Sequence, residues 1–358
     1  MTNQIWAVGL MWTLGGVAEA SPSQQGTAGA DPDLASQGMH GLSYSSGGYS
    51  DSVRFEVPAG VAGHSPTVGL SYAQSLPDGA LGKGWNLNAG GKITRNSGSG
   101  GGVPEHGGAT AETFFLNGQE LHLVSNALGS WYEPEHWDGS RADYDGSSNT
   151  WTVIKDGTVS TYSYVVTVVP GAFHGTLFKG ATASWMLTSV KDRFGNVVQY
   201  EYTQPSVHST DLNTQYGSLT GEVLLSRIHW GAAEVLFNYE LRPNGESTVT
   251  YRPGRREIRE NRLSDVEIRL GGVLYSAYDL VYTDESSTFG YSPTPTPVSL
   301  LREVVRNSTG GGTDLLIRAM DYHLLSPAKV LIPWAERVIS SWRFRCPAPM
   351  PSLSEAVL

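Results

Sequence analysis

The sequence is poor in residues that would support several common functions. It has a single cysteine, Cys346, so no disulfide forms within the chain, and one cysteine alone does not indicate the redox compartment. Its 24 Lys and Arg residues are outnumbered by 34 Asp and Glu residues, which gives a formal net charge of −10. Because nucleic-acid binding needs a basic surface, we expect no nucleic-acid partner.

Long apolar runs and helical patterns are also scarce. Beyond the N-terminus no apolar run approaches the length of a membrane span, so we expect no membrane insertion by this chain. Charged residues make up only 16% of the sequence, whereas Gly (43), Tyr (17) and Trp (10) are abundant. This composition favours short strands joined by tight turns. We predict an all-β fold, a large antiparallel sheet or sandwich of hairpins.

Turn signals between apolar runs support this prediction. Asn117-Gly118, Asp156-Gly157 and Gly271-Gly272 each separate two such runs. These dipeptides favour two-residue hairpin turns, in which both central residues need a positive φ. The 358 residues, 39% of them hydrophobic, are enough for one large β domain or two smaller ones.

The two ends of the chain differ from the rest. The apolar run at residues 5–17 and the following Ala18-Glu19-Ala20 are typical of a signal peptide over residues 1–20. A misassigned start codon and a structural strand are the alternatives. Residues 21–48 are rich in Ser, Gly, Gln and Ala and predict a flexible leader. Residues 311–358 are an atypical, proline-rich tail, expected from a fragment, a frameshift or a truncated gene.

Residues 55–95 carry a series of ordered motifs. They read Glu56-Val57-Pro58-Ala59-Gly60, then Pro66-Thr67-Val68-Gly69-Leu70-Ser71-Tyr72, then Leu81-Gly82-Lys83-Gly84-Trp85-Asn86-Leu87. The stretch resembles the N-terminal domain of the Salmonella virulence plasmid B protein (SpvB), which is shared with the B component of insecticidal Tc toxin complexes. The structural residues implied here are Glu56, Pro58, Gly60, Pro66, Leu70, Ser71, Tyr72, Leu81, Gly82, Gly84 and Trp85. Gly69 departs from the family, which usually has a larger residue there.

The resemblance continues in two later blocks. The first, at residues 115–121, contains Asn117 and Gly118. The second, at residues 185–202, is also similar to a YD (Rhs-type) repeat. Its implied structural residues are Trp185, Asp192, Gly195, Asn196, Tyr200 and Tyr202. Together the blocks place the family-like domain at residues 49–310.

The resemblance implies a non-catalytic structural role in a secreted toxin-complex or virulence protein. Full-length relatives pair with a C component to form a hollow β shell around a toxic polypeptide, and they dock on a pore-forming A component. The expected location is extracellular, although family members are also found in the cytoplasm before release. In SpvB the ADP-ribosyltransferase is a separate C-terminal domain whose blocks are absent here. We therefore expect no enzymatic activity and no cofactor.

One acidic cluster is the strongest candidate for chemistry. Glu133 and Glu135 flank Pro134, and paired carboxylates serve glycoside hydrolysis and ADP-ribosyl transfer. Pro134 and the neighbouring turn signals favour a solvated loop instead. Metal-ligand spacing, a phosphate loop and a nucleophile elbow are absent from the sequence, so we predict no catalytic, cofactor or metal site. Two alternative functions remain: a secreted carbohydrate-binding or adhesive β module, and a secreted glycosidase or ADP-ribosyltransferase using these two glutamates.

Overall fold

A computed structural model describes most of the central chain. The described residues are 41–42, 49–97, 112–127, 129–167, 182–208, 219–243, 246–252, 255–284, 298–308, 313–325 and 330–334. They form strands and one short 3-10 helix, Val61–Gly63, so the all-β prediction is confirmed. The predicted signal peptide and most of the predicted leader and tail lie outside the described residues. Within the predicted leader, Gly41–Leu42 forms strand β1.

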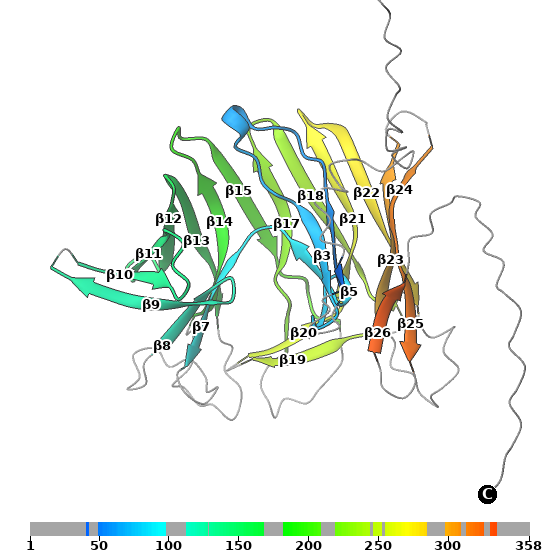
Figure 1. Ribbon diagram of the computed structural model, residues 1–358, viewed down its shortest axis with the longest axis horizontal. Coiled ribbons are helices and arrows are strands. Elements are labelled where there is room, and N and C mark those ends of the chain that lie inside the picture. Colours follow the sequence, from blue (N-terminus) through cyan, green and yellow to red (C-terminus); the bar gives the residue numbers. More distant parts are fainter. Residues whose placement is uncertain are drawn as a thin grey trace, which may run out of the picture. The chain divides into compact units, whose positions relative to one another are not determined.

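A small sheet is built from the first strands and contains the motif region. Its order is β1-β2-β3-β6, all antiparallel. The other bounds are β2, Tyr49–Arg54; β3, Gly69–Ala73; and β6, Trp85–Asn88. Figure 1 shows β3 over the face of the larger sheet. Phe55, just after β2, stacks on Tyr278 of that sheet with ring centroids 4.5 Å apart, and both side chains are buried. Burial of these aromatic rings joins the two sheets.

The following strands pair in a closed ring. The ring runs from β7 through consecutive antiparallel neighbours to β14, which pairs back to β7. Its strands are β7, Lys92–Ser97; β8, Glu112–Leu116; β9, Gln119–Asn126; β10, Gly129–Pro134; β11, Arg141–Asp145; β12, Thr150–Lys155; β13, Thr158–Thr167; and β14, Thr182–Lys191. Closing the ring pairs the edges that an open sheet would expose.

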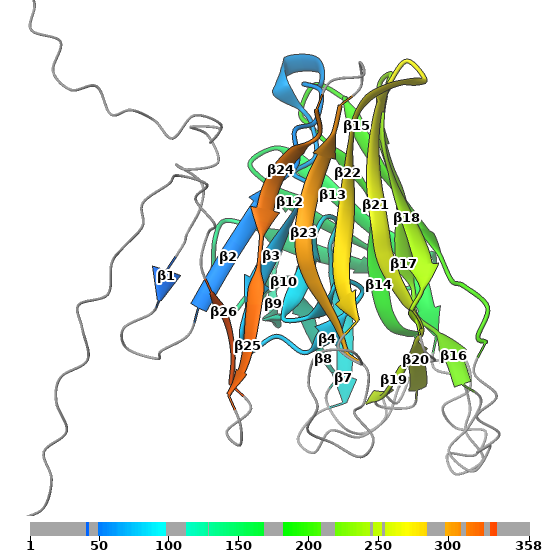
Figure 2. The ribbon, with the colours of Figure 1, turned by 90° about the vertical axis from the view of Figure 1, so that its right-hand side faces the viewer.

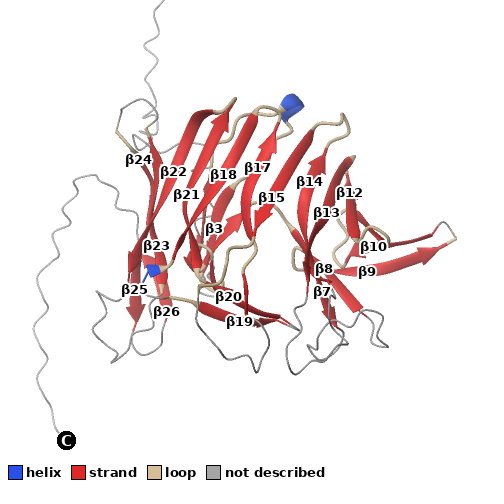
Figure 3. Ribbon diagram, turned by 180° about the vertical axis from the view of Figure 1, so that it is seen from behind, coloured by secondary structure: helices blue, strands red, loops and turns tan. Residues whose placement is uncertain are grey.

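Strand β14 is shared between the ring and a long antiparallel sheet. Its residues 184–186 pair with β7, and its residues 189–191 pair with β15. The long sheet continues in the order β14-β15-β17-β18-β21-β22-β23-β24 (Figure 3). Its further strands are β15, Val197–Thr203; β17, Leu224–Trp230; β18, Ala233–Leu241; β21, Asn261–Leu270; β22, Val273–Asp284; β23, Ser299–Asn307; and β24, Leu315–Ala319. Because β24 pairs with β23, the long sheet extends past residue 310.

Short strands complete the fold at the ends of the long sheet. Strands β4, Asp78–Gly79, and β5, Gly82–Lys83, pair with each other, and β5 also pairs with β23. Strands β16, Leu219–Gly221; β20, Arg255–Arg259; and β19, Thr248–Arg252, form a separate sheet (Figure 2). Strands β25, Asp321–Leu325, and β26, Val330–Trp334, form another pair.

The predicted hairpins are confirmed. Asn117 and Gly118 have φ of 50° and 93° between β8 and β9, and Asp156 and Gly157 have φ of 50° and 76° between β12 and β13. Gly271-Gly272, between β21 and β22, has φ of 60° and 80°. Turns with two positive φ values match the twist of the flanking strands, which is why these dipeptides fix the register locally.

Gly69 is required by the close approach of β2 and β3. A Cβ atom at this position would lie 2.4 Å from the carbonyl oxygen of Val53. We expect Gly69→Ala to lower the free energy of unfolding by about 1–3 kcal/mol, because the backbone of β2 must move to relieve the clash. Urea unfolding of the variant measures this. Gly118→Ala is a poor control because of its positive φ, so Ala73→Gly in the same strand serves instead. An unchanged midpoint in Gly69→Ala would contradict the expectation.

Candidate functional site

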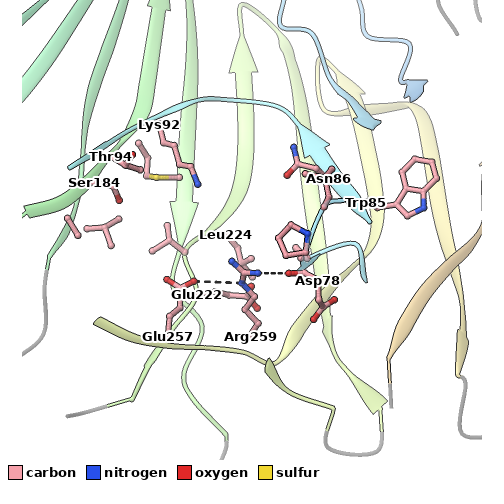
Figure 4. A pocket seen from close by; sticks show the side chains of 18 of the residues that line it. Asp78, Trp85, Asn86, Lys92, Thr94, Ser184, Glu222, Leu224, Glu257 and Arg259 are labelled. Carbon is pink, nitrogen blue, oxygen red and sulfur yellow. Dashed lines mark hydrogen bonds and ion pairs between the residues drawn. The ribbon is translucent and has the colours of Figure 1, made fainter. Parts of the chain in front are cut away.

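A cavity of about 380 Å³ lies where the ring, the long sheet and the small sheets meet. Its walls come from β4, β6, β7, β13, β14 and β20, and from the start of β17 with the turn before it (Figure 4). Val166, Met186 and Leu224 supply apolar surface, while Glu222 and Arg259 supply charge. About half of the residues that line the cavity are polar or charged, so its size and lining suit a small ligand that carries a polar or charged group.

A buried ion cluster borders this cavity and is centred on Arg242, which follows β18. Its guanidinium group, with the side chain 0% exposed, donates to Asp78 Oδ2 at 2.8 Å and to Glu246 Oε1 at 2.7 Å. A third bond goes to the carbonyl oxygen of Gly79. Ser299 donates to both oxygens of Glu246 from its backbone N–H and its hydroxyl, each at 2.7 Å. The cluster therefore ties the β4–β5 hairpin and the start of β23 to the end of β18.

Electrostatics in this cluster are strongly coupled. Burial alone would lower the pKa of Arg242, but the adjacent charges of Asp78 and Glu246 raise it above its usual value. The guanidinium is therefore charged at every physiological pH, and it compensates two carboxylates that are largely removed from water.

In the described part of the chain, the carboxyl group of Glu222 has no such counter-charge beside it. Glu222 is the first residue after β16 and is 5% exposed. It accepts one hydrogen bond, from the backbone N–H of Asn261 at 3.2 Å. No ion pair to Glu222 exists among the described residues. Burial raises its pKa to about 7, although the neighbouring Arg259 and Arg242 act in the opposite direction. A buried carboxyl group with a perturbed pKa beside a cavity marks a candidate functional site.

The raised pKa of Glu222 predicts a pH-dependent stability. Its contribution is fully present below the unfolded pKa of 4.5 and is lost as the pH rises through the folded pKa of about 7. The difference between the folded and unfolded pKa values of Glu222 corresponds to a loss of about 3 kcal/mol in the free energy of unfolding. We expect Glu222→Gln to remove this part of the pH dependence, so that the variant matches the wild type near the acidic end and exceeds it in stability at alkaline pH. Urea unfolding across this range measures the effect, and parallel curves for the two proteins would contradict it.

The residues of the first motif lie in the small sheet and in the β4–β5 hairpin. Leu70, Tyr72 and Trp85 are buried in the core, and the rings of Tyr72 and Trp85 are 5.3 Å apart. Ser71 in β3 donates to Asn88 of β6 at 2.9 Å. Pro58, Pro66 and Leu81 are buried as well, whereas Glu56 is exposed and pairs with Arg306 at 2.8 Å.

Close backbone approach explains the glycines of this motif. Gly82 has a φ of 79°, and a Cβ atom there would lie 2.2 Å from the carbonyl oxygen of Ser299. A Cβ atom at Gly84 would lie 2.5 Å from the ring of Tyr72, and one at Gly60 would lie 1.8 Å from the carbonyl oxygen of His64. Only glycine fits these positions, so the β4–β5 hairpin can reach β23 and the ion cluster.

The residues of the two later blocks, 115–121 and 185–202, are spread over the ring and the long sheet. Asn117, in the turn with Gly118, accepts a hydrogen bond from the backbone N–H of Lys92 at 2.9 Å, which joins the turn to β7. Tyr202 of β15 donates to the carbonyl oxygen of Leu187 at 2.8 Å, and Tyr200 beside it is buried. Trp185 of β14 is 0% exposed within the ring.

Asp192 closes the turn between β14 and β15. Its Oδ1 accepts from the backbone N–H groups of Phe194 and Asn196, each at 2.8 Å, and its Oδ2 accepts from the Asn196 amide at 2.7 Å. Gly195 has a φ of 89°. An aspartate that accepts hydrogen bonds from successive backbone N–H groups stabilises a turn, and Asp192 has this role in the turn between β14 and β15.

The acidic pair is organised differently from the expected solvated loop. Glu133 lies in β10, opposite His122 of β9, is half-buried, and accepts a 2.7 Å hydrogen bond from the indole of Trp131. Pro134 also pairs within this strand, opposite Leu121, because a proline is tolerated at the end of a strand. Glu135 is exposed and follows the strand. The loop prediction is therefore wrong for Glu133.

The described residues contain no group of three or more histidines, cysteines or acids arranged to hold a metal ion. Nor do they include a helix long and apolar enough to cross a membrane. Sequence reasoning missed the cluster around Arg242 and the carboxyl group of Glu222. Arg242 and Glu246 are four residues apart, but Asp78 is 164 residues from Arg242 and Ser299 is 53 residues from Glu246, so no local motif brings the cluster together.

Comparison with known proteins gives matches to solved structures. No family model matches the chain, and no curated protein matches it. A chain in the crystal structure of TcdB2-TccC3 is 18% identical, with a TM-score of 0.59, over 78% of this chain. A chain of the Photorhabdus luminescens Tc holotoxin pore is 16% identical, with a TM-score of 0.56, over 77% of this chain. In both cases this chain spans only 16% of the matched chain.

The N-terminal domain of the effector protein SpvB from Salmonella typhimurium strain LT2 also matches. The identity is 15% and the TM-score 0.53, over 72% of this chain and 98% of that domain. This chain therefore shares its fold with the SpvB N-terminal domain and with part of the Tc toxin chains. The resemblance stated from the sequence motifs is confirmed at the level of the fold.

Proposed function

We propose that this chain is a non-catalytic structural portion of a secreted toxin-complex or virulence protein, where it contributes β-sheet wall to a shell that encloses or translocates a toxic polypeptide. The observation that carries the proposal is the fold match over 98% of the SpvB N-terminal domain, together with the match inside a chain of the TcdB2-TccC3 structure. The closed ring of strands is suited to form part of such a wall, because its strands leave few unpaired edges at which another chain could add.

The partners proposed for the chain are a toxin-complex C-type component and a pore-forming A component. The test is a pull-down of the tagged chain with each component of a Photorhabdus luminescens Tc complex. Retention of either component supports the proposal. If neither is retained by a chain whose β-type circular dichroism shows that it is folded, the proposal loses its support.

A catalytic role is tested separately. The proposal expects no turnover of a glycan panel and no modification of actin in the presence of NAD. The control is the double variant Glu133→Gln and Glu135→Gln. An activity present in the wild-type chain and lost in this variant would contradict the non-catalytic role and favour the secreted enzyme.

The alternative of a carbohydrate-binding or adhesive module has one structural observation in its favour. The side chains of Trp137 and Phe194 are 70% and 68% exposed. Exposed aromatic rings can stack on sugars. A glycan array probed with the wild type and with Trp137→Ala tests this function, and binding lost in the variant would favour it over the structural role.

A further inference from the structure

The carboxyl group of Glu222 faces a cavity that has both the size and the polarity of a ligand site. The cavity of about 380 Å³ is lined by the apolar residues Val166, Met186 and Leu224 and by the acids Glu222 and Glu257. Figure 4 shows Glu222 and Glu257 together with Leu224. Glu222 is 5% exposed and has a single hydrogen bond, from the backbone N–H of Asn261. A carboxylate that is removed from water with so little compensation gains strongly from a cation placed beside it.

The guanidinium groups near Glu222 are already engaged elsewhere. Arg242 donates to Asp78, Glu246 and Gly79. Arg259 donates to the backbone carbonyl oxygen of Asp78 and lies 3.8 Å from Glu257 Oε1. Neither forms an ion pair with Glu222 among the described residues, so their positive charge acts on Glu222 only at longer range.

Glu222 is the carboxyl group of the cavity wall that has no ion pair among the described residues, since Asp78 pairs with Arg242 and Glu257 with Arg259. The titratable groups that line the cavity or border the cluster are the acids Asp78, Glu246 and Glu257, the bases Lys92, Arg95, Arg242 and Arg259, and the phenol of Tyr239. Of the bases on the cavity wall, Arg95 lies 3.6 Å from Glu112 and Arg259 lies 3.8 Å from Glu257, so neither guanidinium group is paired with Glu222. Asp78 Oδ1 is also buried without a hydrogen-bond partner. Lys92 comes from β7 on the other side of the cavity (Figure 4).

We propose that this cavity binds an organic cation on an aliphatic stem, as in a lysine or arginine side chain, with Glu222 as the carboxylate that pairs with the cation. The apolar side chains of Val166, Met186 and Leu224 cover the stem. The cation supplies the counter-charge that the fold itself does not provide for Glu222. This assignment is independent of the proposed structural role.

Binding of a cation favours the ionised form of Glu222 and therefore releases a proton near neutral pH. The pKa of Glu222 is raised to about 7 by burial, so a fraction of the carboxyl groups is protonated before the ligand binds. The affinity falls as the pH drops below that value, by at least roughly tenfold when the pH is more than a unit lower.

The experiment is isothermal titration calorimetry of the full chain with N-acetyl-lysine methylamide and with N-acetyl-arginine methylamide, at about pH 8 and about pH 5.5. We expect binding of at least one of them at the higher pH, weaker binding at the lower pH, and proton release that is seen as a difference between buffers of unlike ionisation enthalpy. The neutral analogue N-acetyl-norleucine methylamide matches the aliphatic stem and is expected not to bind.

Two variants separate the site from the fold. Glu222→Gln is expected to lose binding and the buffer dependence while remaining folded, because it removes a buried charge and keeps the shape of the side chain. Glu234→Gln, on β18 beside Arg227 and outside the cavity, is the matched control and is expected to bind as the wild type does. The proposal is overturned if neither cation binds the wild type, if norleucine binds equally well, or if Glu222→Gln binds unchanged.

Discussion

Replacing Arg242 by alanine is expected to lower the free energy of unfolding by about 3–5 kcal/mol, because it leaves buried carboxylates without their counter-charge. The Arg242 side chain is 0% exposed and lies within 2.8 Å of both Asp78 and Glu246. The loss also frees the β4–β5 hairpin, which Arg242 holds through the carbonyl oxygen of Gly79. Urea unfolding followed by circular dichroism measures the change.

Two further variants test the cause. Arg227→Ala removes an arginine that is 39% exposed and paired with Glu201 and Glu234 on the surface of the sheet. Because exposed pairs contribute little, its effect is expected to be a small fraction of that of Arg242→Ala. Adding Asp78→Asn and Glu246→Gln to Arg242→Ala removes the uncompensated charges and is expected to restore part of the stability. Equal losses in the two arginine variants would contradict this account.

Replacing Trp185 by alanine is expected to cost about 3–5 kcal/mol, the range for truncating a fully buried aromatic side chain. Trp185 is 0% exposed, and its ring lies 5.9 Å from that of Trp151 in β12. Its indole N–H donates to Asn149 Oδ1 at 2.9 Å and to the Asn149 carbonyl oxygen at 3.1 Å. The guanidinium of Arg95 lies 5.1 Å from the Trp185 ring and would lose that contact too.

Trp137→Ala is the matched control for this second prediction. Trp137 is 70% exposed, so its truncation is expected to change stability by no more than about 0.5 kcal/mol. Urea unfolding of the two variants gives the comparison, and near-ultraviolet circular dichroism reports the aromatic packing. A near-native spectrum and urea midpoint for Trp185→Ala would show that the packing of Trp185 against Trp151 and Arg95 is not what stabilises the closed ring.

The cluster that makes Trp185 important could be predicted only in part. Alternation within each strand indicates which side chains are buried, and Trp185 belongs to the family-like block at residues 185–202. The contacts of Trp185 with Arg95 of β7 and with Phe114 of β8 depend on the pairing of β14 with β7, which closes the ring. Sequence separation hides that pairing, since β7 ends at Ser97 and β14 begins at Thr182.

Single residues also show the difference between what the local sequence indicates and what the tertiary contacts decide. The expectation of a loop at Glu133 followed local signals from Pro134 and the turns around it, yet pairing with β9 extends β10 through both residues. Gly69 is an exception to a family pattern when read from the sequence, and the structure supplies its reason, the 2.4 Å approach of Val53. The tertiary contact decides what the residue must be.

The sequence by itself determined the all-β class and the hairpins at Asn117-Gly118 and Asp156-Gly157, because turn chemistry and alternation act between near neighbours. The tertiary structure alone decided the closed ring, the ion cluster around Arg242 and the cavity beside Glu222. Their parts come from strands far apart in the chain, and the charge state of a buried group depends on every element packed around it. Local sequence patterns do not indicate which distant residues will become neighbours in the fold.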